Sequence, residues 1–166
     1  MRRPAAALGS AAFFIAAPGL AAGLIPWWLT RWRAGDPGAL RLPLFAAGAI
    51  LSAAGLAALI HAFARFVAEG SGTPAPVAPT EQLVVGGLYR HVRNPMYLAV
   101  LAIVLGEALI LARPELLVYA LALWAAFALF VRTYEEPTLG RRHGEAYERY
   151  REAVPAWWPR LRPWRS

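Results

Sequence analysis

Two clusters of polar side chains interrupt a largely apolar chain, and they hold most of the groups suited to binding or acid-base chemistry. The first covers residues 86–97 and reads GGLYRHVRNPMY. The second covers residues 132–137, reads RTYEEP, and places two carboxylates side by side at Glu135 and Glu136. Adjacent carboxylates repel each other, so a cationic ligand beside them would be stabilised. The alternative is a solvated pair neutralised by an arginine such as Arg132.

The first cluster leads directly into a helix. Asparagine suits the position before a helix and proline the first helical position, so Asn94 and Pro95 predict a helix start. Capping does not explain why Tyr89, His91 and Tyr97 gather at the same place. A helix N-terminus also offers free backbone N–H groups and a positive dipole end, which suit a carboxylate or phosphate. An anion site is therefore the alternative to an ordinary helix start.

Residue content excludes several kinds of site. The chain has no cysteine, which removes disulfides, thiolate metal ligands and cysteine nucleophiles. The three histidines, His61, His91 and His143, are scattered along the chain. The sequence contains no glycine-rich phosphate loop, dinucleotide-binding fingerprint or His-Glu-x-x-His pattern. We therefore predict no metal site.

The elements that must position both clusters are membrane helices. Hydrophobic residues make up 58% of the 166 residues and charged residues only 16%, a balance typical of an integral membrane protein. A helical crossing needs about 20 mostly apolar residues. Four stretches qualify: residues 8–29, 42–67, 95–111 and 116–131. We predict an all-α fold, a polytopic bundle of about four transmembrane helices that forms one domain over residues 1–166.

The distribution of arginine indicates the orientation. The net charge of +7 rests on arginine alone, because the chain has no lysine, and it favours anionic lipid over nucleic acid as a partner. With four crossings, most arginines share a side with the polar clusters. The opposite side holds Arg31, Arg33, Arg41 and Arg113. By the positive-inside rule, both termini, the loop 68–94 and the tail 132–166 face the cytoplasm, and we expect a bacterial plasma membrane.

Local patterns predict how the helices meet. Residues 8–29 continue past any small-residue cleavage site to an aromatic pair, which favours a retained helix over a signal peptide. The short break at residues 113–115 makes the last two crossings a helical hairpin. Gly48, Ser52 and Gly55 share one helical face, where small side chains let a second helix approach. Glu107 lies in an apolar run and is either hydrogen-bonded in the bundle or functional.

The charged residues 141–152 indicate a further helix, and the aromatic, proline-rich residues 154–159 suit the membrane interface. Taken in order, four segments resemble the isoprenylcysteine carboxyl methyltransferase family, which belongs with the phospholipid methyltransferases. These segments are LVVGGLYRHVRNPMY (83–97), EEPTL (135–139), GEAYERY (144–150) and Val154-Pro155. The resemblance covers about half of the chain.

The resemblance implies an S-adenosylmethionine-dependent methyltransferase whose cofactor lies between the cytoplasmic helix ends and the C-terminal segment, without a Rossmann domain. The residues that match the cofactor-contacting stretch are Glu81, Gln82, Leu83, Val84, Tyr89, His91, Asn94, Pro95, Met96 and Tyr97. The acidic motif maps onto Glu135 or Glu136, and Arg132 matches an arginine that places substrate or cofactor. The eukaryotic enzymes have histidine at the positions of Glu81 and Asn94.

The expected reaction is methyl transfer to a lipidic or hydrophobic acceptor that enters from the bilayer. Methyl transfer is an in-line displacement, so the protein must align the reactants and exclude water. A carboxylate acceptor needs no general base, whereas an amine or thiol would need His91, Glu135 or Tyr97. The acceptor is left open between a prenylcysteine carboxylate, a phospholipid amine and a small thiol. A non-enzymatic membrane assembly protein is the alternative of another class, and the oligomeric state is open.

Overall fold

The computed structural model describes residues 16–70 and 82–165, and within them the protein is helical with no strand. Residues 8–15 of the first predicted span and Glu81 lie outside the described residues. The elements, in chain order, are a π-helical turn (Leu20–Leu24), α2 (Ile25–Thr30), α3 (Arg41–Gly70), α4 (Pro95–Leu111), α5 (Pro114–Phe130), a second π-helical turn (Val131–Glu135), α6 (Glu136–His143) and α7 (Glu145–Ala153).

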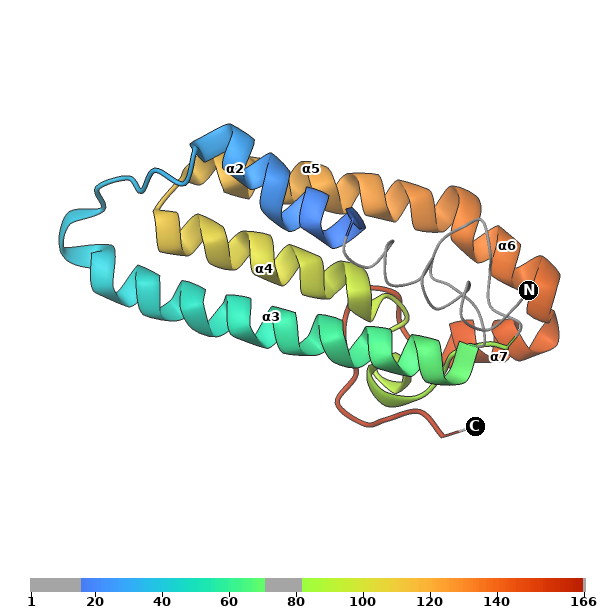
Figure 1. The fold of residues 1–166 in the computed structure, drawn as a ribbon. Helices are drawn as coiled ribbons and strands as arrows, with labels where there is room; N and C mark the ends of the chain where they lie inside the picture. Colours follow the sequence, from blue (N-terminus) through green and yellow to red (C-terminus); the bar gives the residue numbers. More distant parts are fainter. Residues whose placement is uncertain (1–15, 71–81, 166) are drawn as a thin grey trace.

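The helix α4 lies at the centre of the bundle and packs mainly against α3, with α5 and the first π-helical turn on its other sides (Figure 1). Glycine allows the closest part of the α3–α4 contact. A Cβ atom on Gly48 would lie 2.5 Å from the Gly106 carbonyl oxygen, and one on Gly55 would lie 2.9 Å from the Ala99 carbonyl oxygen. The predicted role of the small residues on α3, close helix packing, is therefore confirmed.

One end of the bundle is closed by short connections. The chain reverses between α4 and α5 through Ala112, which adopts a left-handed conformation with φ 50°. The Gly35 N–H donates to the Leu111 carbonyl at 2.7 Å, so the loop after α2 packs on this turn. Arg113 pairs with Glu115 at the same place. The predicted hairpin is present, and the loops that hold Arg31, Arg33, Arg41 and Arg113 meet at this end.

Among the described residues, two helices are long and apolar enough to cross a membrane, Gly38–Glu69 and Pro114–His143. The second differs from the prediction, which ends the last apolar span at residue 131. The chain does not leave the helix there, because the π-helical turn Val131–Glu135 carries α5 directly into α6. The central helix α4 is apolar but shorter, with 17 residues.

The C-terminal region turns back onto the loop before α4. The predicted charged helix of residues 141–152 is divided between α6 and α7 at Gly144, where φ is 51°. Tyr147, Tyr150 and Val154 then form a buried cluster on the inner side of α7, against Leu83 and Val85. Figure 1 shows the C-terminal segment running back from α7 beside this loop.

Candidate functional site

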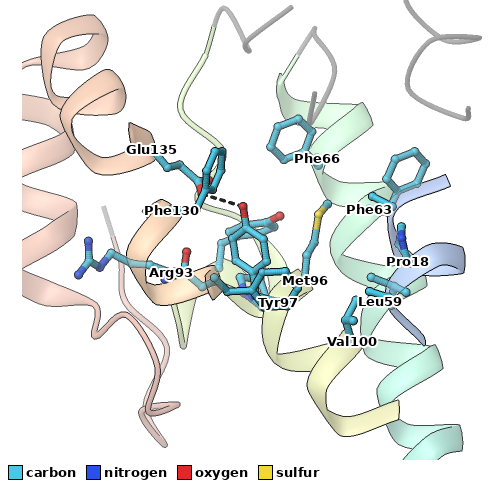
Figure 2. Close-up of a pocket in the computed structure, with 16 residues that line it drawn as sticks. Pro18, Leu59, Phe63, Phe66, Arg93, Met96, Tyr97, Val100, Phe130 and Glu135 are labelled. Atoms are coloured by element: carbon cyan, nitrogen blue, oxygen red, sulfur yellow. Dashed lines mark hydrogen bonds between the residues drawn. The ribbon is translucent and has the colours of Figure 1, made fainter. Parts of the chain in front are cut away.

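A cavity of about 380 Å³ lies at the end of the bundle where α4 begins. Helical segments that are far apart in the sequence form its wall: the first described helix, α3, the start of α4, the end of α5 and the second π-helical turn. The lining residues are Ala17, Pro18, Ala21, Leu59, Phe63, Phe66, Tyr89, Arg93, Asn94, Pro95, Met96, Tyr97, Val100, Phe127, Phe130 and Glu135. Figure 2 shows ten of them by name around the opening.

Glu135 supplies the carboxylate of this cavity. The Tyr97 hydroxyl donates to Glu135 Oε2 at 2.9 Å, as Figure 2 shows. No cationic side chain of the described residues forms an ion pair with Glu135. A buried carboxylate without a counter-ion is costly, so a cation bound here would gain free energy from it. The π-helical turn that ends at Glu135 contains one more residue per turn than an α-helix, and such turns are frequent at functional sites.

Glu136 has a different environment. Arg93 donates through Nη1 to Glu136 Oε1 at 2.7 Å and to the Tyr147 hydroxyl at 3.1 Å. The Arg93 and Glu136 side chains are only 13% and 21% exposed, so the pair is largely shielded from water. In Figure 2 the Arg93 guanidinium extends away from the cavity. Arg93, rather than the exposed Arg132, therefore neutralises one of the two adjacent acids.

The first turn of α4 faces the cavity without a side-chain cap. Asn94 precedes the helix but makes no capping hydrogen bond. Its amide instead donates through Nδ2 to the Ala156 carbonyl at 3.2 Å, and the residue is only 7% exposed. The N–H groups of this turn therefore keep their capacity to bind an anion. The helix start is as predicted, but the capping role of the Asn94 side chain is wrong because this side chain binds the tail.

The loop that brings Tyr89 to the cavity is held by α3. The Gly86 N–H donates to Glu69 Oε2 at 2.9 Å. Gly87 has φ 55°, and a Cβ atom there would lie 2.6 Å from His61 Nε2. A side chain at this position would therefore be strained in conformation and would collide with α3. His61 and Arg65, which the sequence leaves between a polar site and the lipid interface, lie against this loop.

The C-terminal segment holds the other side of the same loop. The Tyr150 hydroxyl donates to the Tyr89 carbonyl at 2.7 Å, and the Arg93 N–H donates to the Pro155 carbonyl at 3.0 Å. His91 Nδ1 lies 2.8 Å from the Arg160 carbonyl oxygen. Burial raises the pKa of the Tyr150 hydroxyl, and burial followed by the charge of Glu135 raises the pKa of Tyr89. Both hydroxyls therefore stay neutral near pH 7.

The structure brings six of the predicted site residues to the cavity, namely Tyr89, Asn94, Pro95, Met96, Tyr97 and Glu135. The other described ones lie elsewhere. Val84 and Leu83 pack in two separate apolar clusters, and Gln82 and Arg132 are exposed. His91 bonds the C-terminal segment and Glu136 pairs with Arg93.

The apolar wall of the cavity was missed by the sequence analysis. It contains Leu59, Phe63 and Phe66 of α3, together with Phe127 and Phe130 of α5. The three α3 residues are four and three positions apart, so they share a helical face. This spacing, ending next to the glycine-rich loop, was a signal that could have found them.

Glu107 does not line the cavity. Its Oε2 is buried without a hydrogen-bond partner among the described residues, as is Ser52 Oγ on α3. Within residues 16–70 and 82–165, no group of three or more His, Asp or Glu side chains is placed to hold a metal ion. The chemistry that the described site offers is therefore that of a carboxylate, two tyrosine hydroxyls, a helix N-terminus and an apolar wall.

Comparison with known proteins adds two findings. The family model for phospholipid methyltransferase (PEMT) matches residues 43–146, more than half of the chain. The protein-S-isoprenylcysteine O-methyltransferase of Schizosaccharomyces pombe is 36% identical over 75 residues, which are 45% of this chain and 31% of that protein. The matched region thus spans about a third of that relative. No solved structure matches the chain.

Proposed function

Because the chain belongs to the phospholipid methyltransferase family, we propose that it transfers a methyl group from S-adenosylmethionine to a lipidic or hydrophobic acceptor in the membrane. One observation carries the proposal: the Glu135 carboxylate lies in an otherwise largely apolar cavity, held by Tyr97 and without a cationic partner among the described residues. A positively charged ligand is what such a site stabilises.

The cavity fits this cofactor in size and chemistry. Its volume of about 380 Å³ falls within the roughly 300–1,000 Å³ of small-molecule sites. S-adenosylmethionine supplies an electrophilic methyl group on a positively charged sulfur. Glu135 and Tyr97 would hold a cationic or hydroxyl part of it, and the uncapped first turn of α4 would hold its carboxylate. Tyr89, Asn94 and Met96 complete that side of the site.

The chain's own residues perform three tasks. Tyr97 fixes the Glu135 carboxylate by a hydrogen bond, which orients it toward the cavity. The apolar wall from α3 and α5 excludes water and confines the acceptor, which is how alignment lowers the barrier. If the acceptor is an amine or thiol, Glu135 is the cavity group that would accept its proton. His91, whose ring lies against the Arg160 carbonyl, is less suited to that role.

Two other predicted groups are assigned to the edge of the site. Arg132 is exposed one helical turn before Glu135, so it would contact only a ligand that extends out of the cavity. Residues 81–84 would contact the cofactor from the same outer side. Glu136 would act indirectly, by fixing Arg93 and through it the loop before α4.

The apolar wall favours an acceptor with a hydrocarbon part. Phe63, Phe66, Phe127 and Phe130 present aromatic surface to the cavity, which would bind a prenyl or acyl chain. The name of the Schizosaccharomyces pombe relative suggests an isoprenylcysteine carboxylate, and the family description suggests a phospholipid amine. A small thiol is the third acceptor class. The first two share the lipidic character that the wall supports.

For topology, we propose four crossings at residues 8–29, 42–67, 95–111 and 116–131 in one domain. The loop 68–94 and the tail 132–166 then share the cytoplasmic side with both termini, and the membrane is a bacterial plasma membrane. The arginine distribution along the sequence supports this orientation. Tyr97, Glu135 and the start of α4 then lie where S-adenosylmethionine is available.

The test is calorimetric titration of S-adenosylmethionine into the purified protein in lipid nanodiscs. The wild type is expected to bind saturably and Glu135→Gln is expected to lose binding while keeping its melting temperature. Glu145→Gln, which removes a carboxylate that is exposed on α7, is the matched control and keeps binding. Undiminished binding by Glu135→Gln would show that the site is misplaced. No binding by folded wild-type protein would favour the non-enzymatic alternative.

A further inference from the structure

The C-terminal tail lies beside the apolar part of the bundle rather than beyond its end. The Trp157 ring centroid is 6.2 Å from that of Trp124 and 6.4 Å from that of Tyr97. Trp124 lies in the apolar helix α5, eleven residues before Glu135. At about 1.5 Å of rise per residue, the tail therefore reaches roughly 16 Å back along α5 from the acidic pair.

The tail has two faces. Trp157, Arg160 and Trp164 face the protein: Arg160 and Trp164 donate their backbone N–H groups to the His91 and Arg90 carbonyls, both at 2.9 Å. Trp158 and Leu161 face outward and are 81% and 97% exposed. Exposed large apolar side chains in a segment fixed by hydrogen bonds indicate a surface that meets something apolar.

The charge of the tail identifies the occupant. Residues 155–165 contain three arginines and no acidic residue. Arg160 bonds the Ala153 carbonyl, whereas Arg162 and Arg165 are exposed and make no ion pair with a described residue. Tryptophan and leucine flanked by free arginines, at the level where a membrane helix ends, suit the headgroup region of an anionic leaflet.

We propose that residues 155–165 lie in the interface of an anionic lipid leaflet, with Trp158 and Leu161 in its apolar boundary and Arg162 and Arg165 on lipid phosphates. The tail binds the loop before α4 through His91, Arg90 and Asn94. Anionic lipid thereby stabilises the loop that forms one side of the cavity. The position of the tail is independent of the proposed function, and only its effect on cofactor binding rests on it.

The position is tested with an environment-sensitive bimane label. The chain has no cysteine, so Leu161→Cys provides a single labelling site. Leu121→Cys, 65% exposed in the middle of α5, is the lipid-facing control, and Arg149→Cys, exposed on α7, is the aqueous control. In nanodiscs that contain phosphatidylglycerol, the label at 161 is expected to be quenched by spin-labelled lipid and protected from iodide.

Charge is tested in the same labelled protein. Arg162→Gln with Arg165→Gln, or replacement of phosphatidylglycerol by phosphatidylcholine, is expected to reduce quenching by lipid and increase quenching by iodide. Quenching by iodide as strong as at position 149 would overturn the proposal. Protection from both quenchers would overturn it too, because the face would then be covered by protein, such as a second copy of the chain.

The effect on the site is measured as the S-adenosylmethionine affinity in the two kinds of nanodisc. Wild-type protein is expected to bind more tightly with phosphatidylglycerol, and Trp158→Ala with Leu161→Ala is expected to lose that dependence. Equal affinities in both lipids would overturn the effect on the loop. If the wild type binds no S-adenosylmethionine, the proposed function fails, while the label still reports the position of the tail.

Discussion

At the scale of single residues, two adjacent carboxylates have separate roles. Glu136 is neutralised by Arg93 at 2.7 Å, and Glu135 receives only the Tyr97 hydroxyl at 2.9 Å among the described residues. Charge repulsion between them alone would raise the cost of placing both in a half-buried site. Pairing one with arginine leaves the other free for a ligand.

Removal of the Tyr97 hydroxyl tests its role beside Glu135. We expect Tyr97→Phe to weaken S-adenosylmethionine binding by a factor of about 2–10, the effect of one hydrogen bond. Its melting temperature should change little because the ring contact with Phe127 at 4.7 Å remains. Tyr134→Phe, at an exposed position two helical turns or less from the site, is the control for calorimetry. A lower melting temperature with unchanged affinity would make Tyr97 a packing residue.

Arg93 is expected to matter for stability. Arg93→Gln leaves Glu136 without its cation and the Tyr147 hydroxyl without its donor. The expected loss is about 2–3 kcal/mol in the free energy of unfolding, measured by denaturant titration in detergent. The double variant with Glu136→Gln should recover part of that loss because no unpaired charge is left. Equal losses in the single and double variants would argue against the pair.

At the scale of elements, two local features position the site. The π-helical turn keeps α5 and α6 continuous and brings Glu135 to the cavity, while Gly86 and Gly87 let the loop before α4 pack on α3. The central helix α4 carries Tyr97 and is fixed against α3 by small residues. A change in the α3–α4 contact should therefore be felt at the cavity.

Gly48→Val tests this contact. A Cβ atom at Gly48 already lies 2.5 Å from the Gly106 carbonyl oxygen, so valine must push the helices apart. The expected loss is about 1–3 kcal/mol in the free energy of unfolding, as for other overpacked sites. Ala53→Val, which adds the same kind of side chain on the exposed face of α3, should have little effect. Equal melting temperatures for the two variants would mean that α3 and α4 do not pack as described.

At the scale of the whole molecule, the site depends on the C-terminal segment as much as on the bundle. Tyr89, Tyr147 and Tyr150 are buried where α7 meets the loop before α4. The burial of these groups raises the pKa of all three hydroxyls. The attachment of the tail to the loop therefore requires neutral tyrosines.

This attachment predicts a loss of stability at alkaline pH. In the unfolded chain the tyrosines lose their protons near pH 10, about their ordinary pKa. The folded protein keeps them to higher pH, so above that point it binds more protons than the unfolded chain. The free energy of unfolding should be independent of these groups below about pH 10 and fall as the pH rises further.

Thermal melting across this pH range measures the effect. Tyr150→Phe should be less stable at neutral pH, because it loses its bond to the Tyr89 carbonyl, but its stability should fall less steeply with pH. Tyr134→Phe, at an exposed position, should keep the wild-type slope. A Tyr150→Phe variant with the full wild-type slope would mean that this hydroxyl does not contribute.

The sequence by itself determined the elements that follow from local composition. The apolar runs, the break at residues 113–115 and the small residues of α3 predicted the helices, the hairpin and the α3–α4 contact, because hydropathy, proline and residue size act locally. The polar cluster before α4 predicted Tyr89, Asn94, Met96 and Tyr97, which the structure brings to one cavity.

Only the tertiary structure decided which groups meet. The pairing of Arg93 with Glu136 joins positions 43 residues apart, and the bond of His91 to Arg160 joins positions 69 apart. Neither spacing follows from helix periodicity, so the sequence could not separate Glu135 from Glu136 or assign His91 to the tail. The aromatic wall and the return of Trp157 to Trp124 likewise depend on how α7 turns the chain back. These contacts are set by packing between distant segments, which no local pattern records.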